Sequence, residues 1–450
     1  MNIRLLFFNL LLGLETLSVN ASQQAVFTIE QAVDYALKNA FSVRIAQTNI
    51  DIAHEQVVQA KGALGPQISA QGVYTRFSQS SSAKLPIGPG GALENIKFTH
   101  IQDEKIIANL NLPIDILGVL SKSIQSASYS QKAAVKNFDA THNNLKAQVR
   151  AAYYNVLQSK ELVEVAKESL HDAEVLLKNT ESKLNAGTVP KYNLTQFEVQ
   201  VQQAKAALYN AEAAYNLSKQ TLNNTIGRSI TTPFEPVPVK EIPHLMNSNK
   251  HYAKYALEHR PEIRAARYVI DSTAENKIYQ AYGMTPSLGL SGVYTRDFHP
   301  SGLGGFPSLF IATATLNIPV YDSGITNSRI QIAKEQMNQA KIQYEQTSLT
   351  VQLQVDQALV NLKNAFLQIE VAEKSRTYSE SSYHVAKASY DAGVNVLLDL
   401  LDSYTQLVQS RATLVNTRYS YLNAYAALQQ AVGDDQLEQI SQKEDQKNNP

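Results

Sequence analysis

The amino-acid sequence predicts a mostly α-helical fold in which two pairs of β-strands interrupt long coiled-coil hairpins, the whole arrangement occurring twice in one chain. Three observations predict it. Short motifs recur at a nearly constant spacing, two 68-residue stretches carry no proline or glycine after their first residue, and four short segments alternate apolar and polar residues.

The repeat is visible letter by letter. Gly72–Arg76 (GVYTR) recurs at Gly292–Arg296, a shift of 220 positions, whereas Leu110–Pro113 matches Leu316–Pro319 at a shift of 206. The 14-residue difference lies between the two matched blocks, in a segment that we expect to be a loop in both copies, 78–100 in the first and 300–307 in the second.

We divide the chain into five parts. Residues 1–21 carry Arg4, a run of apolar residues and a small-residue ending at Ala21, which is typical of a secretory signal. The other parts are a first repeat over 22–229, a proline-rich linker over 230–247 that we expect to be extended, a second repeat over 248–433, and a polar tail over 434–450 that we expect to be disordered.

Each repeat is expected to contain the same elements in the same order. In the first these are a helix over 28–61, strands over 66–77 and 104–114, a long helix over 118–185 and a helix over 193–226; in the second, a helix over 248–282, strands over 286–298 and 308–320, a long helix over 324–391 and a helix over 396–432.

The long helices follow from a heptad pattern. Apolar residues recur at strict sevens from Val149 to Leu184, and 68 residues of helix span ~100 Å at 1.5 Å per residue. A shorter helix from the end of one repeat and one from the start of the other together have the length of a long helix. We therefore expect them to stack end to end alongside it.

The strands follow from a period of two. Ile106, Ala108, Leu110 and Leu112 share one face of their strand, and the other three strands alternate in the same way. Periodicity alone is equally consistent with a soluble sheet that covers a core. Aromatic residues toward the strand ends favour strands that cross a membrane, and the candidates for its interfaces are Tyr74, Phe77, Tyr294, Phe298 and Phe310.

Geometry extends this interpretation to several copies. Four strands in lipid leave two unpaired edges, so strands from other chains must close the sheet. Two chains supply eight strands, which side chains fill; three supply twelve, which leave a lumen. We favour three, with a 12-stranded barrel continued by a helical barrel.

Composition excludes several classes of function. The chain has no cysteine, 40 basic residues against 40 acidic ones, and no basic run, which argues against thiol or cysteine–zinc chemistry and against a nucleic-acid partner. No histidine motif with metal-ligand spacing is present, so we expect no metal, no cofactor and no enzymatic activity.

At this point the sequence resembles the TolC-type outer-membrane efflux and secretion channels, also called outer membrane factors. The resemblance spans residues 28–433, and its most specific parts are Tyr390–Asp402 (YDAGVNVLLDLLD) and Asn416–Leu422 (NTRYSYL). It implies a homotrimer in the outer membrane of a Gram-negative bacterium that extends into the periplasm, in contact with outer-membrane lipid. It also implies partners, a periplasmic adaptor (membrane fusion protein) and an inner-membrane transporter, and export of drugs, metals or proteins.

The resemblance also implies roles for residues at the two hairpin tips, where Gly187 and Gly393 end the long helices. Adaptor contact is expected at Ala186, Gly187, Thr188, Val189, Ala392, Gly393 and Val394, and a periplasmic gate and selectivity filter at Asp399, Asp402, Tyr390, Asn395, Tyr192 and Asn193. On spacing alone, Asp399 and Asp402 are explained as an exposed acidic helix start; the resemblance implies rings of carboxylates instead.

Two of these positions depart from the family pattern. Asn395 stands where an arginine is usual and Asn193 where an aspartate is usual. A charge-assisted latch is therefore absent at these positions, and neutral hydrogen bonds of ~1 kcal/mol remain. We expect a gate that is held more weakly or by other residues.

Two non-enzymatic alternatives remain. A structural trimeric coiled coil, such as an adhesin with a β membrane anchor, explains the heptads but predicts one cluster of strands at one end of the chain. A general diffusion porin requires many strands and few long helices. The sequence has two separated strand pairs, each placed between helices.

Overall fold

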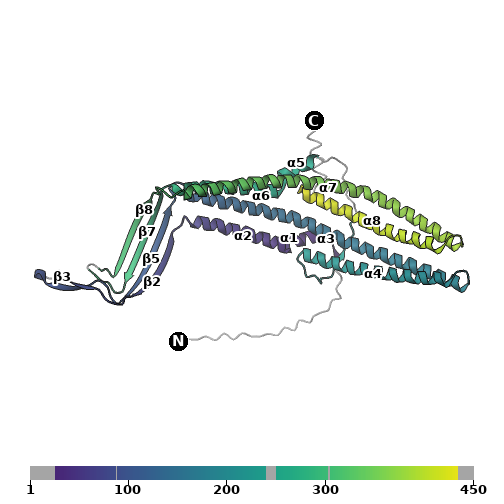
Figure 1. The fold of residues 1–450 in the computed structure, drawn as a ribbon, viewed down its shortest axis with the longest axis horizontal. Helices are drawn as coiled ribbons and strands as arrows, with labels where there is room; N and C mark the ends of the chain where they lie inside the picture. Colours follow the sequence, from purple (N-terminus) through teal and green to yellow (C-terminus); the bar gives the residue numbers. More distant parts are fainter. Residues whose placement is uncertain (1–25, 88, 240–249, 303–304, 434–450) are drawn as a thin grey trace, which may run out of the picture.

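The protein is elongated, with a β-sheet at one end and long helices that run side by side to the other (Figure 1). This computed structural model describes residues 26–87, 89–239, 250–302 and 305–433. The expected signal over 1–21, part of the linker and the expected disordered tail lie outside the described residues.

Two long helices form the axis of the molecule, α3 (Val119–Asn185) and α7 (Ile325–Asp391), each 67 residues long. Both begin after a glycine with positive φ, Gly118 at 72° and Gly324 at 85°. A carboxylate then accepts from the first turn: Asp115 from the backbone N–H of Ser121, and Asp322 from that of Thr326. Negative charge at a helix N-terminus is favourable, so both starts are fixed locally.

The expected single helices over 28–61 and 248–282 are each two helices, which corrects the prediction. The first pair is α1 (Ile29–Asn39) and α2 (Phe41–Gly62), and the second is α5 (Lys250–His259) and α6 (Pro261–Ala281), followed by a short 3₁₀ turn, η2 (Tyr282–Met284). Ala40 and Arg260 stand at the breaks with extended ψ of 140° and 132°. Before Pro261 the helical conformation is disfavoured, whereas the break at Ala40 has no proline to signal it.

The remaining helices, α4 (Lys191–Thr225) and α8 (Leu397–Val432), return from the far end and stop at these breaks. Gly227 follows α4 so closely that a Cβ on it would lie 2.7 Å from the carbonyl oxygen of Asn39, and a Cβ on Gly433 would lie 3.0 Å from Arg260. The expected stacking between repeats is therefore wrong, because each returning helix meets the opening helices of its own repeat. Both α6 and α8 contact α3 and α7, and so lie between the two long helices.

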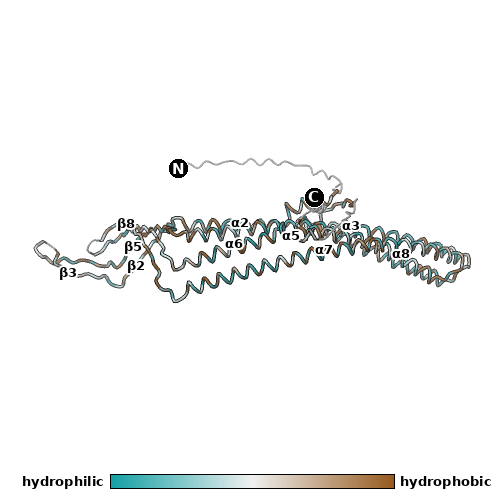
Figure 2. Tube along the Cα trace, turned by 90° about the horizontal axis from the view of Figure 1, so that it is seen from above, coloured by the Kyte–Doolittle hydropathy of each residue, from teal (hydrophilic) through white to brown (hydrophobic). Residues whose placement is uncertain are grey.

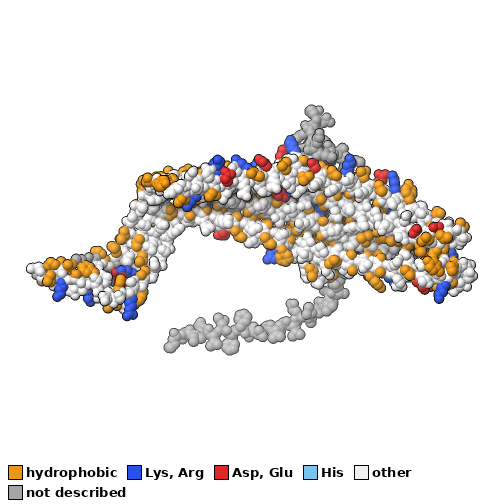
Figure 3. Space-filling model, viewed as in Figure 1, with side chains coloured by type: hydrophobic (Ala, Val, Ile, Leu, Met, Phe, Trp, Pro, Cys, Tyr) orange, Lys and Arg blue, Asp and Glu red, His pale blue; other side chains and the backbone are white. Residues whose placement is uncertain are grey.

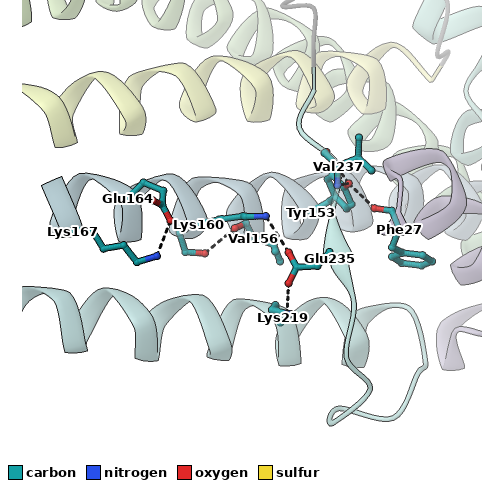
Figure 4. Close-up of polar contacts among 10 residues, drawn as sticks. Phe27, Tyr153, Val156, Lys160, Glu164, Lys167, Lys219, Glu235 and Val237 are labelled. Carbon is teal, nitrogen blue, oxygen red and sulfur yellow. Dashed lines mark hydrogen bonds and ion pairs between the residues drawn. The ribbon is translucent and has the colours of Figure 1, made fainter. Parts of the chain in front are cut away.

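A polar clamp holds the middle of the molecule, where the linker and the N-terminal segment cross α3 (Figure 4). Strand β1 (Val26–Phe27) pairs in parallel with β6 (Glu235–Pro236). The buried Tyr153 hydroxyl lies 2.8 Å from the carbonyl oxygen of Phe27 and 2.9 Å from that of Val237, and accepts from the Val237 N–H at 2.8 Å. Lys160 and Lys219 flank Glu235, so the linker, which begins with a turn at Ile230 and Thr231, is extended and fastened around Glu235.

The sheet stands apart from the helices (Figure 1) and follows the order of the chain. It consists of β2 (Gln67–Arg76), β5 (Gln102–Ile114), β7 (Ser287–Asp297) and β8 (Ser308–Asn317), all antiparallel. The register aligns Ile68, Leu110, Gly292 and Ala312 across all four strands, so the apolar positions share one continuous face. Every residue of β8 is exposed, which contradicts a sheet that covers a soluble core.

The expected loop over 78–100 contains a second hairpin, β3 (Ser82–Pro86) and β4 (Leu93–Lys97), joined through a 3₁₀ turn, η1 (Pro89–Gly91). Five pairs of residues align across it, from Ser82–Lys97 to Pro86–Leu93. The prolines and glycines that suggested a loop are concentrated at its turn, where Gly90 and Gly91 take positive φ.

Apolar and polar residues alternate along the described helices (Figure 2). None of these helices is apolar over a length sufficient to cross a bilayer.

Candidate functional site at the helical tips

The two hairpin tips have the same backbone geometry. At the end of α3, the N–H of Gly187 bonds the carbonyl of Leu184 and the N–H of Thr188 bonds that of Lys183. At the end of α7, Gly393 and Val394 repeat both bonds, and the two glycines have φ of 72° and 74°. This Schellman arrangement satisfies the last carbonyls of each helix and reverses the chain, as expected from the two glycines.

The tip residues face solvent. Six of the seven residues expected at an adaptor contact are exposed, and Val189 is half-buried. In the second hairpin, exposed apolar side chains follow the turn, with Val394 78% exposed, Val396 63% and Leu398 65%. Hydrophobic side chains gather at this end of the molecule (Figure 3). Such a patch on a hairpin end is typical of a protein contact.

One side chain from each hairpin joins the two tips. Asn193, in the first turn of α4, donates its amide N–H to the hydroxyl of Tyr390 at 3.0 Å. Tyr390 lies in the last turn of α7, is 9% exposed, and meets the ring of Phe197 edge-on at 6.5 Å. The structure thus brings together the predicted pair Asn193 and Tyr390 through a neutral hydrogen bond.

A second link, which the sequence analysis missed, supplies the charge absent from the first. The Lys183 ammonium lies 2.7 Å from the Asp391 carboxylate and 4.7 Å from the centre of the Tyr390 ring. It therefore bonds the neighbouring helix end by an ion pair and by a cation–π contact. Its signal in the sequence is weak: an opposite charge within four residues of each tip glycine.

Asn395 and Tyr192 are not part of this network. Among the described residues, neither side chain makes a hydrogen bond, and Tyr192 is 66% exposed. Only the backbone N–H of Asn395 bonds, to the carbonyl of Ser389 at 3.3 Å. Both residues lie at the tips, but the structure of one chain gives them no latch partner.

Asp399 and Asp402 lie on the first two turns of α8 and are both exposed. Leu400, Ser403 and Tyr404 point the other way, into the core between the hairpins. The two carboxylates are therefore neighbours on the solvent-facing side of the helix, one turn apart. Within the described residues, no cluster of three or more acidic or histidine side chains has metal-binding geometry.

Above the tips, α3 and α8 meet along a polar seam. Arg411 bonds the Asp172 carboxylate at 3.0 Å, and the Tyr404 hydroxyl donates to the carbonyl of Ser169 at 2.5 Å. Burial raises the pKa of the neighbouring Tyr383 to about 12, so its hydroxyl remains neutral. This seam joins the two hairpins above the tips.

Comparison with known proteins identifies the family to which the chain belongs. The model of the outer membrane efflux protein family matches residues 32–228 and 253–434, which is most of the chain. The outer membrane efflux protein BepC of Brucella suis is 24% identical over 418 residues, covering 90% of this chain and 85% of BepC.

Solved structures show the same fold. The CmeC outer membrane channel of Campylobacter jejuni matches with a TM-score of 0.74 at 20% identity, covering 94% of this chain and 89% of CmeC. The open state of the MtrE outer membrane channel of Neisseria gonorrhoeae matches with a TM-score of 0.69 at 20% identity, covering 90% and 89%. The chain therefore belongs to the outer membrane efflux protein family, whose members are outer-membrane transport channels and not enzymes.

Proposed function

We propose that three copies of this chain close into one continuous duct, the exit channel of an export system in which an inner-membrane transporter and a periplasmic adaptor deliver solutes to the helical tips. The observation that carries this proposal is that, among the described residues, both lateral edges lack a partner, as unpaired strand edges in the sheet and as exposed apolar surfaces on the helices.

At the membrane end these edges are strands. Within the four-stranded sheet, β2 pairs only with β5 and β8 only with β7, so the outer backbone groups of each are free. In a bilayer each unpaired backbone group costs several kcal/mol. An edge formed by β8 is complete when it meets β2 of another copy, because the two edges then become one ladder.

Below the sheet the same edges continue as helices. Strand β8 leads into α7, which exposes Leu349, Val360, Leu367, Tyr378 and Val385 at heptad-related spacings. Strand β2 follows α2, and on that side α2 and α4 expose further apolar side chains, among them Ile45, Ile52, Val199, Tyr209 and Leu217. These two surfaces differ, so contact between copies is head to tail, and it ends only when a ring closes.

The number of copies follows from the strands. A ring of two copies has eight strands, and side chains fill its interior, whereas a ring of three has twelve strands and leaves a passage.

The aromatic residues expected at the membrane interfaces fit the outer surface of such a barrel. Tyr294 and Phe310 face each other across β7 and β8 and are 42% and 65% exposed, on the surface that lipid would cover.

The tips would then form the periplasmic entrance. Threefold symmetry converts Asp399 and Asp402 into two rings of three carboxylates, which attract cations in a narrow aqueous passage. The apolar tip residues would receive the adaptor, and the Asn193–Tyr390 and Lys183–Asp391 links would hold the entrance closed. That a similar channel, MtrE, has an open state supports a gate of this kind.

A structural coiled-coil protein with a membrane anchor is the alternative, and conductance separates the two. The purified protein should have about three times the mass of one mature chain, which is less than the 49.7 kDa of the full sequence once residues 1–21 are removed, and should carry ionic current across a planar bilayer. Val360→Glu with Leu367→Glu should give monomers, because charge would be buried between copies. Lys363→Glu, on the charged side of the same helix, is the matched control. A monomeric wild type, or a trimer without current, would refute the proposal.

A further inference from the structure

A cavity of about 700 Å³ lies at the middle of the helical layer, where neither α6 nor α8 fills the space between α3 and α7. It sits beside Arg260, at the break between α5 and α6 and the end of α8. Its volume is in the range of small-molecule binding sites.

The cavity wall is made of amides. Eight of its sixteen lining residues are Asn or Gln, and two more are threonines. Each amide presents both donors and an acceptor. Five of them, Gln148, Gln343, Gln346, Gln357 and Asn361, make no side-chain hydrogen bond to the described residues, so their groups are available to a ligand.

The only charges in the wall are already satisfied. Arg260 bonds both carboxylate oxygens of Glu262, at 3.2 and 3.0 Å, and its third nitrogen bonds the Gln354 side chain at 2.7 Å and the carbonyl of Ala431 at 3.2 Å. Lys146 and Arg150 of α3 line an adjoining, smaller recess of about 120 Å³ that shares Gln430 with the cavity, and neither of them lines the cavity itself. The cavity therefore has no free charge with which to bind an ion.

Helix α7 carries its charged residues and its cavity-lining residues on opposite sides. Advancing 100° per residue from the buried Val351 and Val355, the charged residues of this stretch fall on one side of the helix: Lys341, Glu345, Asp356 and Lys363. The cavity residues fall on the other: Gln343, Gln346, Thr350, Gln354, Gln357 and Asn361. The exposed Leu349 and Val360 lie between the two, opposite the core.

This arrangement gives each side of α7 a separate environment in a closed ring. The apolar edge with Leu349 and Val360 meets the next copy in the ring. Of the charged side and the cavity side of α7, one therefore faces the surroundings of the duct and the other faces its interior. A charged surface suits the bulk aqueous phase, whereas an uncharged wall lets solutes of either sign pass.

We propose that this cavity is a binding site inside the duct for uncharged solutes rich in hydroxyl groups, such as neutral oligosaccharides; the placement of the site inside the duct rests on the proposed function. A hydroxyl group both donates and accepts hydrogen bonds, as the free amides do. A charged solute would lose hydration in the cavity, and no free charge in the wall would compensate for that loss. Such a solute is bound weakly on its passage and released again.

Maltotriose, an uncharged trisaccharide, is a suitable probe. Its binding to the detergent-solubilised full-length protein is measured by saturation-transfer NMR, and its effect on current is measured in a planar bilayer. The double substitution Gln357→Ala with Asn361→Ala removes two free amides one turn apart and should weaken binding about tenfold, the loss of two modest hydrogen bonds. Gln352→Ala, on the same helix outside the cavity, is the matched control and should bind as the wild type does.

A second variant, Gln357→Leu, keeps the side-chain size and should also weaken maltotriose binding, because it removes both the donor and the acceptor of the amide. Equal affinity in the wild type, the double variant and the control would overturn the cavity as the site, as would a conducting trimer that does not bind maltotriose. Specific binding without any current would leave the cavity standing and remove the duct, so the two proposals fail separately.

Discussion

Replacing Tyr390 by phenylalanine should loosen the closed entrance, and the structure gives the size of the effect. The change removes only the hydroxyl that accepts from Asn193 at 3.0 Å, since a phenylalanine ring can still meet Phe197 edge-on and lie beneath the Lys183 ammonium. A neutral hydrogen bond is worth about 1 kcal/mol net, or about fivefold in an equilibrium. If three copies open together, the losses add to about 3 kcal/mol and the open population rises by about 150-fold.

The ion pair should matter less. Lys183 and Asp391 are 26% and 46% exposed, so solvent screens their attraction and the pair is worth under about 1 kcal/mol. Asp391→Ala, which removes the ion pair and leaves the contact of Lys183 with the Tyr390 ring, should therefore open the entrance less than Tyr390→Phe does.

Single-channel recording of the purified trimer measures the open probability directly. Tyr192→Phe is the control, because Tyr192 is a neighbouring tip tyrosine whose exposed side chain makes no hydrogen bond within the described residues. An open probability in Tyr390→Phe that equals that of Tyr192→Phe would show that the Asn193–Tyr390 bond does not hold the entrance.

Three further outcomes follow from the geometry. Tyr153→Phe removes the hydroxyl that the Phe27 carbonyl and the Val237 backbone groups share, leaving the Val237 N–H only its 3.4 Å bond to the Phe27 carbonyl, and should lower stability by about 2 kcal/mol, measured by thermal unfolding. Burial raises the pKa of Tyr153 to about 12, so this contribution should be complete below pH 10 and lost as the pH rises through about 12, an alkaline step that the phenylalanine variant lacks. Asp399→Ala with Asp402→Ala should reduce cation preference in reversal-potential measurements; an unchanged preference would exclude these carboxylates as the filter. Gly227→Ala should lower the melting temperature, because φ is 75° and the added Cβ would lie 2.7 Å from the Asn39 carbonyl oxygen, at a cost of at least about 1–2 kcal/mol.

The sequence predicts the fold well where a single periodicity dominates. The strands alternate with period two and the long helices lack breakers, so their bounds agree with the structure to within a few residues. The heptad seam holds at Val149, Val156 and Val163, all buried, and then drifts, so that Ala173 and Leu176 are the buried residues toward the tip. A straight helix has 3.6 residues per turn and departs from a repeat of 3.5 over such a length.

What the sequence could not show depends on contacts between distant segments. The break at Ala40 arises where Gly227 packs against it, and the ion pair of Lys183 with Asp391 joins residues 208 positions apart. The hairpin in residues 82–97 was hidden because its strands are only five residues long. The tip residues were found through the two glycines and the family resemblance, and their roles in gating and adaptor contact stay predictions.

The two long helices are continuous across the middle of the molecule, whereas each of their neighbours is interrupted there, at Ala40 and Arg260. Two continuous helices resist stretching along their length. Because the neighbouring helices are interrupted, the bundle can still twist at the interruptions. In the proposed ring, twisting of the half that carries the tips would be taken up at these two breaks before it reached the strands. If the entrance opens as proposed, the bore at the strand end would therefore stay constant.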